Sequence, residues 1–109
     1  MAQISEILLK LLERTNQDKV IWKSTVDERA YVTVIGKNSV VIQQDHRIYG
    51  IEMKVLDQQG REIDQLQFEG AASATVQSQL NDLYHQARRL ALGVDGQLDK
   101  MLQELEVDP

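Results

Sequence analysis

Residues 30–44 read AYVTVIGKNSVVIQQ, and this stretch decides the fold. Two runs rich in β-branched residues, Ala30 to Ile35 and Ser39 to Gln44, lie on either side of Gly36-Lys37-Asn38. Such runs favour strands, and glycine and asparagine tolerate the positive φ angles of a tight hairpin turn. The stretch therefore predicts two antiparallel strands joined by a short turn.

Three further segments have the composition of strands. They are Lys19 to Thr25, Ile48 to Leu56 and Glu62 to Phe68. Between the last two, Asp57-Gln58-Gln59-Gly60 places Asp and Gly where a type I turn favours them, so these two segments should pair antiparallel. The apolar residues of the last segment do not share one parity, which predicts a β-bulge near Asp64 or Gln65.

Three segments carry apolar residues at helical spacing. They cover about residues 3–15, Val76 to Ala91 and Val94 to Leu105. Ser73 or Thr75 is expected to cap the start of the second helix, Gly93 to end it, and Asp95 to cap the third. We therefore expect one α+β domain over residues 1–109, an antiparallel β-meander of about five strands with one N-terminal helix and two C-terminal helices.

The charge of the chain is unevenly distributed. The formal net charge of -5 divides into +1 for residues 1–54 and -6 for residues 55–109. An acidic second half repels phosphate backbones, and no apolar run reaches membrane-spanning length, so we predict neither nucleic-acid nor membrane binding. The chain has no cysteine, and Glu6 and Glu13 among the first leucines are not typical of a signal peptide. These features predict a cytoplasmic protein.

Four short motifs carry a resemblance. They are Leu11-Leu12-Glu13-Arg14-Thr15, Val20-Ile21-Trp22, Val55-Leu56-Asp57-Gln58-Gln59-Gly60 and Ala87-Arg88-Arg89-Leu90-Ala91-Leu92-Gly93-Val94-Asp95. In them the chain resembles a group of small uncharacterised bacterial α+β proteins with a leucine-rich first helix, an Ile-Trp strand start, a β-meander and an Ala-Arg-Arg C-terminal helix. The resemblance implies this fold and carries no activity.

Groups suited to catalysis or metal binding are sparse. His46 and His85 are far apart in the sequence, and without cysteine they do not supply the ligands of a zinc site. Asp45-His46 lacks the strand-to-helix elbow of a nucleophilic triad. The carboxylate pairs Glu62 with Asp64 and Glu104 with Glu106 stand in polar sequence, whereas acid–base pairs need one desolvated member. We predict no catalytic residue, no cofactor and no metal, hence no enzymatic activity of its own.

The distribution of apolar residues over the sheet suggests an interface. We expect Trp22 in the core, on a helix-facing side that comprises Val20, Trp22, Val32, Val34, Val40, Ile42, Ile51, Met53 and Val55. The opposite side would then be unusually apolar, and its candidate interface residues are Ile21, Tyr31, Thr33, Ile35 and Val41. The alternative is an ordinary amphipathic sheet with scattered exposed apolar residues.

These observations favour a non-enzymatic protein–protein interaction or adaptor module of unknown partner. A homodimer through the sheet is expected, with the C-terminal helix as the second choice of interface. Two alternatives stay open. One is an acidic inhibitor or immunity-like protein that covers a basic partner. The other is a small-ligand binder or enzyme subunit with a pocket between sheet and helices, where Tyr49, Tyr84 and His85 are the polar groups.

Overall fold

The computed structural model describes residues 3–45, 50–67 and 73–107. The elements follow in the order α1 (Ile4–Asn16), β1 (Lys23–Ser24), β2 (Ala30–Ile35), β3 (Asn38–Asp45), β4 (Gly50–Leu56), β5 (Glu62–Gln67), α2 (Ala74–Leu92) and α3 (Val94–Glu106). The predicted fold class is confirmed. Among residues named above, His46, Ile48, Tyr49 and Phe68 lie outside the described ranges.

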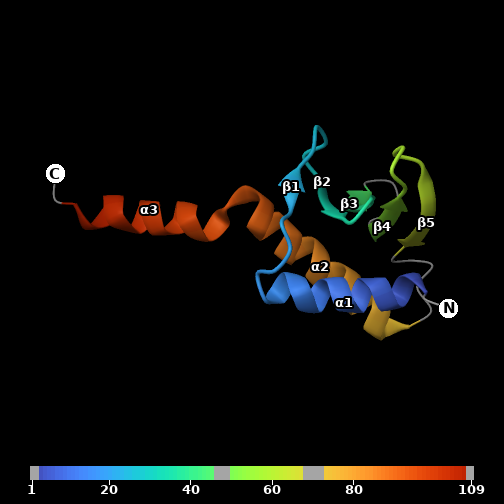
Figure 1. The fold of residues 1–109 in the computed structure, drawn as a ribbon. Coiled ribbons are helices and arrows are strands. Elements are labelled where there is room, and N and C mark those ends of the chain that lie inside the picture. The colour runs from blue at the N-terminus through green and yellow to red at the C-terminus, as the bar shows by residue number, and fades with distance from the viewer. Residues whose placement is uncertain (1–2, 46–49, 68–72, 108–109) are drawn as a thin grey trace.

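The five strands form one antiparallel meander in the order β1-β2-β3-β4-β5. Helices α1 and α2 lie next to each other and pack against the same face of this sheet (Figure 1). The core between sheet and helices is formed by buried leucines of both helices and by Val40, Ile42, Ile51 and Met53 of the central strands. Within the described residues, no helix combines the length and the apolar composition needed to cross a lipid bilayer.

The predicted hairpin is confirmed, and its turn fixes the faces of β2. Ile35 pairs with Asn38, which leaves Gly36, at φ 63°, and Lys37 as the turn residues. This register pairs Tyr31 with Ile42. Ile42 belongs to the core beneath the helices, and directly opposed residues share a face of the sheet. Tyr31 and the other odd-numbered residues of β2 therefore point toward the helices.

The predicted face assignment is therefore wrong in β2. Tyr31 and Thr33 are each 3% exposed and face the helices, whereas Val34 is 69% exposed on the opposite side. The ring of Tyr31 lies 5.8 Å from that of Tyr84 in α2, centroid to centroid. Both faces of AYVTVI are apolar, so hydrophobicity alone does not distinguish them, and a one-residue change of register exchanges them.

Strand β1 is much shorter than the predicted segment Lys19 to Thr25. Only Lys23 and Ser24 pair with β2, opposite Val32 and Tyr31. Trp22 precedes them and is buried as predicted, and its indole N–H donates to the Thr15 hydroxyl over 3.1 Å. Because β1 begins only at Lys23, the second half of β2, Thr33 to Ile35, has no strand partner on this side among the described residues.

The predicted bulge in β5 lies at Ile63, one residue before Asp64. Val55 pairs with Asp64 and Leu56 pairs with Glu62, so Ile63 is the additional residue on β5. It is exposed, whereas Leu66, further along, packs against the core. The bulge explains why the apolar residues of this strand do not share one parity.

The helix ends follow the predicted signals in part. The Ser73 hydroxyl accepts a hydrogen bond from the Val76 N–H over 3.2 Å, and Gly93, at φ 61°, ends α2. Asp95 does not cap α3; it lies in the first turn and pairs with Arg89. Helix α3 contacts α2 alone among the described elements and extends away from the domain (Figure 1).

Helix α3 lies outside the core. No residue of this helix is buried. Its apolar residues Leu98, Met101, Leu102 and Leu105, here called the α3 stripe, are between 52% and 80% exposed. The stripe has the spacing of a core-facing helix surface, but no described element buries it.

Candidate functional site

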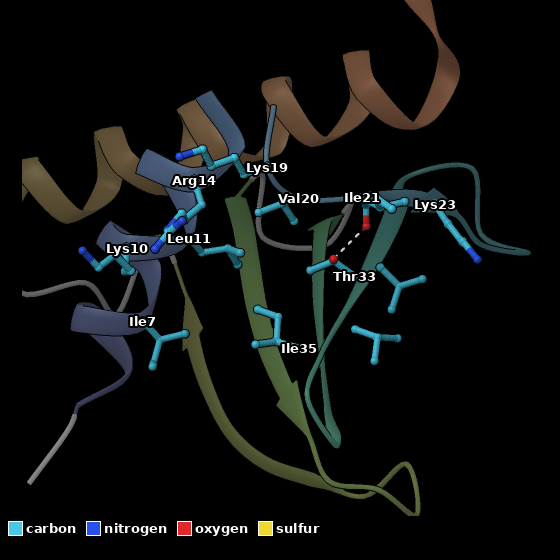
Figure 2. Close-up of a pocket in the computed structure, with 12 residues that line it drawn as sticks. Ile7, Lys10, Leu11, Arg14, Lys19, Val20, Ile21, Lys23, Thr33 and Ile35 are labelled. Carbon is cyan, nitrogen blue, oxygen red and sulfur yellow. Dashed lines mark hydrogen bonds between the residues drawn. The ribbon is translucent and has the colours of Figure 1, made fainter. Parts of the chain in front are cut away.

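A groove of about 700 Å³ runs between α1 and the uncovered edge of β2 (Figure 2). We call it the α1–β2 groove. Helix α1 contributes Ile7, Lys10, Leu11 and Arg14 to its lining; the segment before and within β1 contributes Lys19, Val20, Ile21 and Lys23; and β2 contributes Val32, Thr33, Val34 and Ile35. The groove therefore exists because β1 is too short to cover β2.

Helical spacing explains the α1 wall. Ile7, Lys10, Leu11 and Arg14 follow each other at intervals of three, one and three residues, and such positions share one face of a helix. Leu11 is buried, whereas Ile7 is exposed. One part of the surface of α1 therefore packs in the core, and an adjacent part lines the groove.

The opposite wall is held by one side-chain hydrogen bond. The Thr33 hydroxyl donates to the carbonyl oxygen of Ile21 over 2.7 Å (Figure 2). This bond takes the place of strand pairing where β1 has not yet begun. It leaves the side chain of Ile21 76% exposed beside Val34 and Ile35, which are also exposed.

The groove combines an apolar lining with positive charge. Its charged residues, here called the basic rim, are Lys10, Arg14, Lys19 and Lys23. Lys10 also lies 3.7 Å from Glu13, a solvent-exposed pair that contributes little stability. Among the residues that the structure describes, no acidic side chain lines the groove. In a protein with a net charge of -5, this is a local positive site on an acidic molecule.

Of the three polar groups weighed for a ligand pocket, Tyr84 and His85 are neighbours on α2, and Tyr49 lies outside the described residues. His85 is exposed on α2, with its ring against that of Tyr84 at 5.6 Å. Tyr84 is buried in the core, and this burial, followed by the nearby Tyr31, raises its pKa above the ordinary value of 10.0. Its hydroxyl therefore stays protonated at neutral pH. Among the described residues, no group of three or more histidine or carboxylate side chains is placed to hold a metal ion.

The predicted pocket between sheet and helices differs from the observed one. That space holds the packed core, and neither Tyr84 nor His85 lines the α1–β2 groove. The expected third polar group, Tyr49, lies outside the described residues. The observed hollow lies at the sheet edge instead, because the interior is filled.

A separate polar cluster lies on the sheet face away from the helices. Glu52 is buried, and its carboxylate accepts hydrogen bonds from the side-chain amides of Gln43, over 3.0 Å, and Gln67, over 3.4 Å. The ammonium group of Lys54 lies 4.0 Å from Glu52 and 3.9 Å from Glu62. These contacts pair the buried carboxylate within the sheet, so the cluster is a structural feature.

The predicted interface is divided by the structure. Ile21, Thr33 and Ile35 line the α1–β2 groove, whereas Tyr31 lies in the core and Val41 lies half-buried on the opposite face of the sheet. The α1 wall and the basic rim were not predicted as part of a site. The sequence does contain a signal for the basic rim, because eight of the twelve Lys and Arg residues lie within residues 1–54.

The chain was compared with protein-family models, with curated proteins and with solved structures. None of the three comparisons found a match. The resemblance to small bacterial α+β proteins therefore stays a prediction.

Proposed function

We propose that this chain is a non-enzymatic protein-binding module whose α1–β2 groove accepts an apolar helix with acidic flanks from a partner protein. The observation that carries the proposal is the exposure of Ile21 and Val34 inside a groove whose charged residues, within the described ranges, are all basic. Exposed apolar surface with a polar rim is typical of protein interaction sites. The proposal keeps the predicted cytoplasmic location, which the absence of cysteine fits.

The apolar lining would supply affinity. Ile7, Ile21, Val34 and Ile35 are all exposed in the groove, and full burial of such a side chain contributes about 1.5–3 kcal/mol. The loss of translational and rotational freedom on association, about 4–15 kcal/mol, opposes this gain and is of similar size, so the basic rim must contribute as well. The basic rim would steer an acidic segment to the groove and fix its orientation.

A small anionic amphiphile is the second candidate ligand. The volume of about 700 Å³ falls within the range of small-molecule sites. Such sites enclose most of their ligand, however, whereas Ile21 and Val34 are largely open to solvent. This openness favours a helix, which lies along the groove and keeps one side in water.

The test is fluorescence anisotropy with two labelled synthetic helices. Both peptides carry leucines at intervals of four and three residues, which form one apolar face. The positions that flank this face are glutamate in one peptide and lysine in the other. We expect the glutamate peptide to bind and the lysine peptide to bind far more weakly. Dodecanoate is titrated in parallel, and saturable dodecanoate binding without peptide binding would support the amphiphile instead.

Matched variants locate the binding. Ile21→Glu places a carboxylate in the groove, and Ile63→Glu makes the same change at an exposed position on the far edge of the sheet. The first should weaken binding of the glutamate peptide more than about tenfold, because it adds an unpaired charge to an apolar contact. The second should leave binding unchanged. Equal effects of both variants would contradict the proposal.

A further inference from the structure

We propose that the α1–β2 groove accepts helix α3 of a second copy of this chain, and that two copies exchange these helices in a closed dimer. The inference rests on the proposed function, because it names an occupant of the same groove. It also implies that a partner protein must compete with α3 for the site.

Helix α3 requires a cover that the described part of its own chain does not provide. All four residues of the α3 stripe are more than half exposed, and α2 is the only described element that α3 contacts. An isolated helix of thirteen residues is marginal in water, and most helices gain their stability by burying an apolar face. A surface that receives the stripe would therefore stabilise the helix.

The groove and the stripe agree in length. The α1 wall extends from Ile7 to Arg14, and the α3 stripe extends from Leu98 to Leu105. Each covers eight residues, about 10 Å along a helix axis from the first residue to the last. The stripe can therefore lie along α1 with its leucines opposite the exposed apolar residues of the groove.

The two surfaces also have opposite charge. Helix α3 contains Asp95, Asp99, Glu104 and Glu106 against the single basic residue Lys100. Asp95 pairs with Arg89, whereas the structure shows no ion pair for Asp99, Glu104 or Glu106 within the described residues. These carboxylates lie beside the stripe and would meet the basic rim of the groove.

Charge argues against the alternative in which two α3 helices pack against each other. Such a symmetric contact would bring the acidic flanks of both helices together, and like charges at close range are destabilising. Docking in the groove places the same carboxylates next to Arg14, Lys19 and Lys23.

The occupant must come from another copy because of the link between α2 and α3. Gly93 is the single residue between them, whereas helices that fold back on each other use loops of about 2–5 residues. Helix α3 therefore extends away from the groove of its own chain, and the molecule measures 59 Å in its longest dimension (Figure 1). A two-fold axis lets each copy insert its α3 into the other, which closes the assembly.

The test uses two variants with complementary defects. Leu102→Glu damages the α3 stripe and leaves the groove intact, whereas Val34→Glu damages the groove and leaves α3 intact. Molar mass is measured by sedimentation velocity over the micromolar range, with Ile63→Glu as the control. We expect the wild type and the control to be dimers and each damaged variant to be a monomer. A mixture of the two variants should again contain dimers, because one intact contact can form.

Each result decides the inference. A wild type that is monomeric at every concentration overturns it. A Val34→Glu variant that stays dimeric while Leu102→Glu dissociates also overturns it, because α3 would then contact a surface other than the groove. If circular dichroism shows that Leu102→Glu is unfolded, Leu105→Glu replaces it, because Leu105 is even more exposed.

A peptide titration separates this inference from the proposed function. Leu102→Glu should bind the synthetic glutamate peptide more tightly than the wild type does, because its groove is not occupied by α3. Equal peptide affinity for both proteins would overturn the exchange and leave the binding function standing. A third outcome is that neither the wild type nor Leu102→Glu binds the peptide, while the wild type is dimeric and both damaged variants are monomeric. This outcome would overturn the proposed binding of other proteins and leave the exchange of α3 standing.

Discussion

The Thr33 hydroxyl donates a hydrogen bond of 2.7 Å to the carbonyl oxygen of Ile21. This bond joins β2 to the segment before β1, and these two parts of the chain form the open wall of the α1–β2 groove. Strand pairing between β1 and β2 begins only at Lys23. The side-chain bond therefore holds the segment of Ile21 in place at a point where the sheet does not.

Replacement of Thr33 by valine should loosen this wall. Thr33→Val keeps the shape of the side chain and removes the donor, so the Ile21 carbonyl loses its partner and the free energy of unfolding falls by about 1 kcal/mol. Binding of the glutamate peptide should weaken as well. Thr33→Ser, which keeps the hydroxyl, serves as the control in urea unfolding and in peptide titration. Equal losses in both variants would show that the bond has no such role.

Leucines of the three helices should differ in their contribution to stability. Leu11→Ala and Leu83→Ala remove buried side chains and should each lower the free energy of unfolding by about 2–5 kcal/mol. Leu102→Ala should change it by less than about 0.5 kcal/mol in dilute protein, because Leu102 is exposed on α3. Thermal unfolding measures all three. A loss for Leu102→Ala as large as that for Leu83→Ala, at concentrations where the protein is monomeric, would mean that α3 packs on its own domain.

The turn between β4 and β5 should make stability depend on pH. The Asp57 carboxylate accepts hydrogen bonds of 2.9 Å from the backbone N–H groups of Arg61 and Gln59, and one of 2.8 Å from the Arg61 side chain. The bond from the Arg61 backbone, with the others, lowers the pKa of Asp57 below its ordinary value of 3.8. Its contribution to stability is therefore full well above pH 3.8 and is lost as pH falls through 3.8 and the folded pKa.

Asp57→Asn tests this dependence. The variant should be less stable than the wild type at neutral pH, and the difference should shrink as pH falls below about 4. Asp82→Asn, at an exposed position on α2, is the matched control. Urea unfolding at a series of pH values gives the comparison, and a difference that grows toward low pH would contradict the assignment.

The basic rim should make groove binding depend on salt. The double variant Lys19→Glu and Lys23→Glu reverses two rim charges and should abolish the preference for the glutamate peptide over the lysine peptide. Lys37→Glu changes an exposed turn residue outside the groove and should preserve it. Affinity of the wild type for the glutamate peptide should fall as salt is added. A salt-independent affinity would show that the rim takes no part.

The sequence predicted the elements well because the signals are local. The hairpin turn at Gly36, the cap at Ser73 and the helix end at Gly93 each depend on residues within one turn of the chain. Burial of Trp22 followed from its apolar surface, and Thr15 supplies the partner that the indole N–H needs.

The site could not be predicted, because it depends on the register of strand pairing and on which surfaces no other element covers. The faces of β2 are set by the pairing of Ile35 with Asn38, which a strand with two apolar faces does not reveal. The groove exists because β1 begins only at Lys23, after Ile21, and periodicity does not show where strand pairing begins. Likewise, the stripe of α3 has the pattern of a core helix although no described element covers it.

The most direct test of the central claim is a map of backbone amide chemical shifts in isotope-labelled Leu102→Glu protein during titration with the glutamate peptide. We predict changes in three segments that meet only in the fold, residues 7–14, residues 19–23 and residues 32–35. Changes centred instead on Arg88 and Leu92, beside the smaller hollow of about 300 Å³, or an absence of any change at saturating peptide, would contradict the claim that the α1–β2 groove is the binding site.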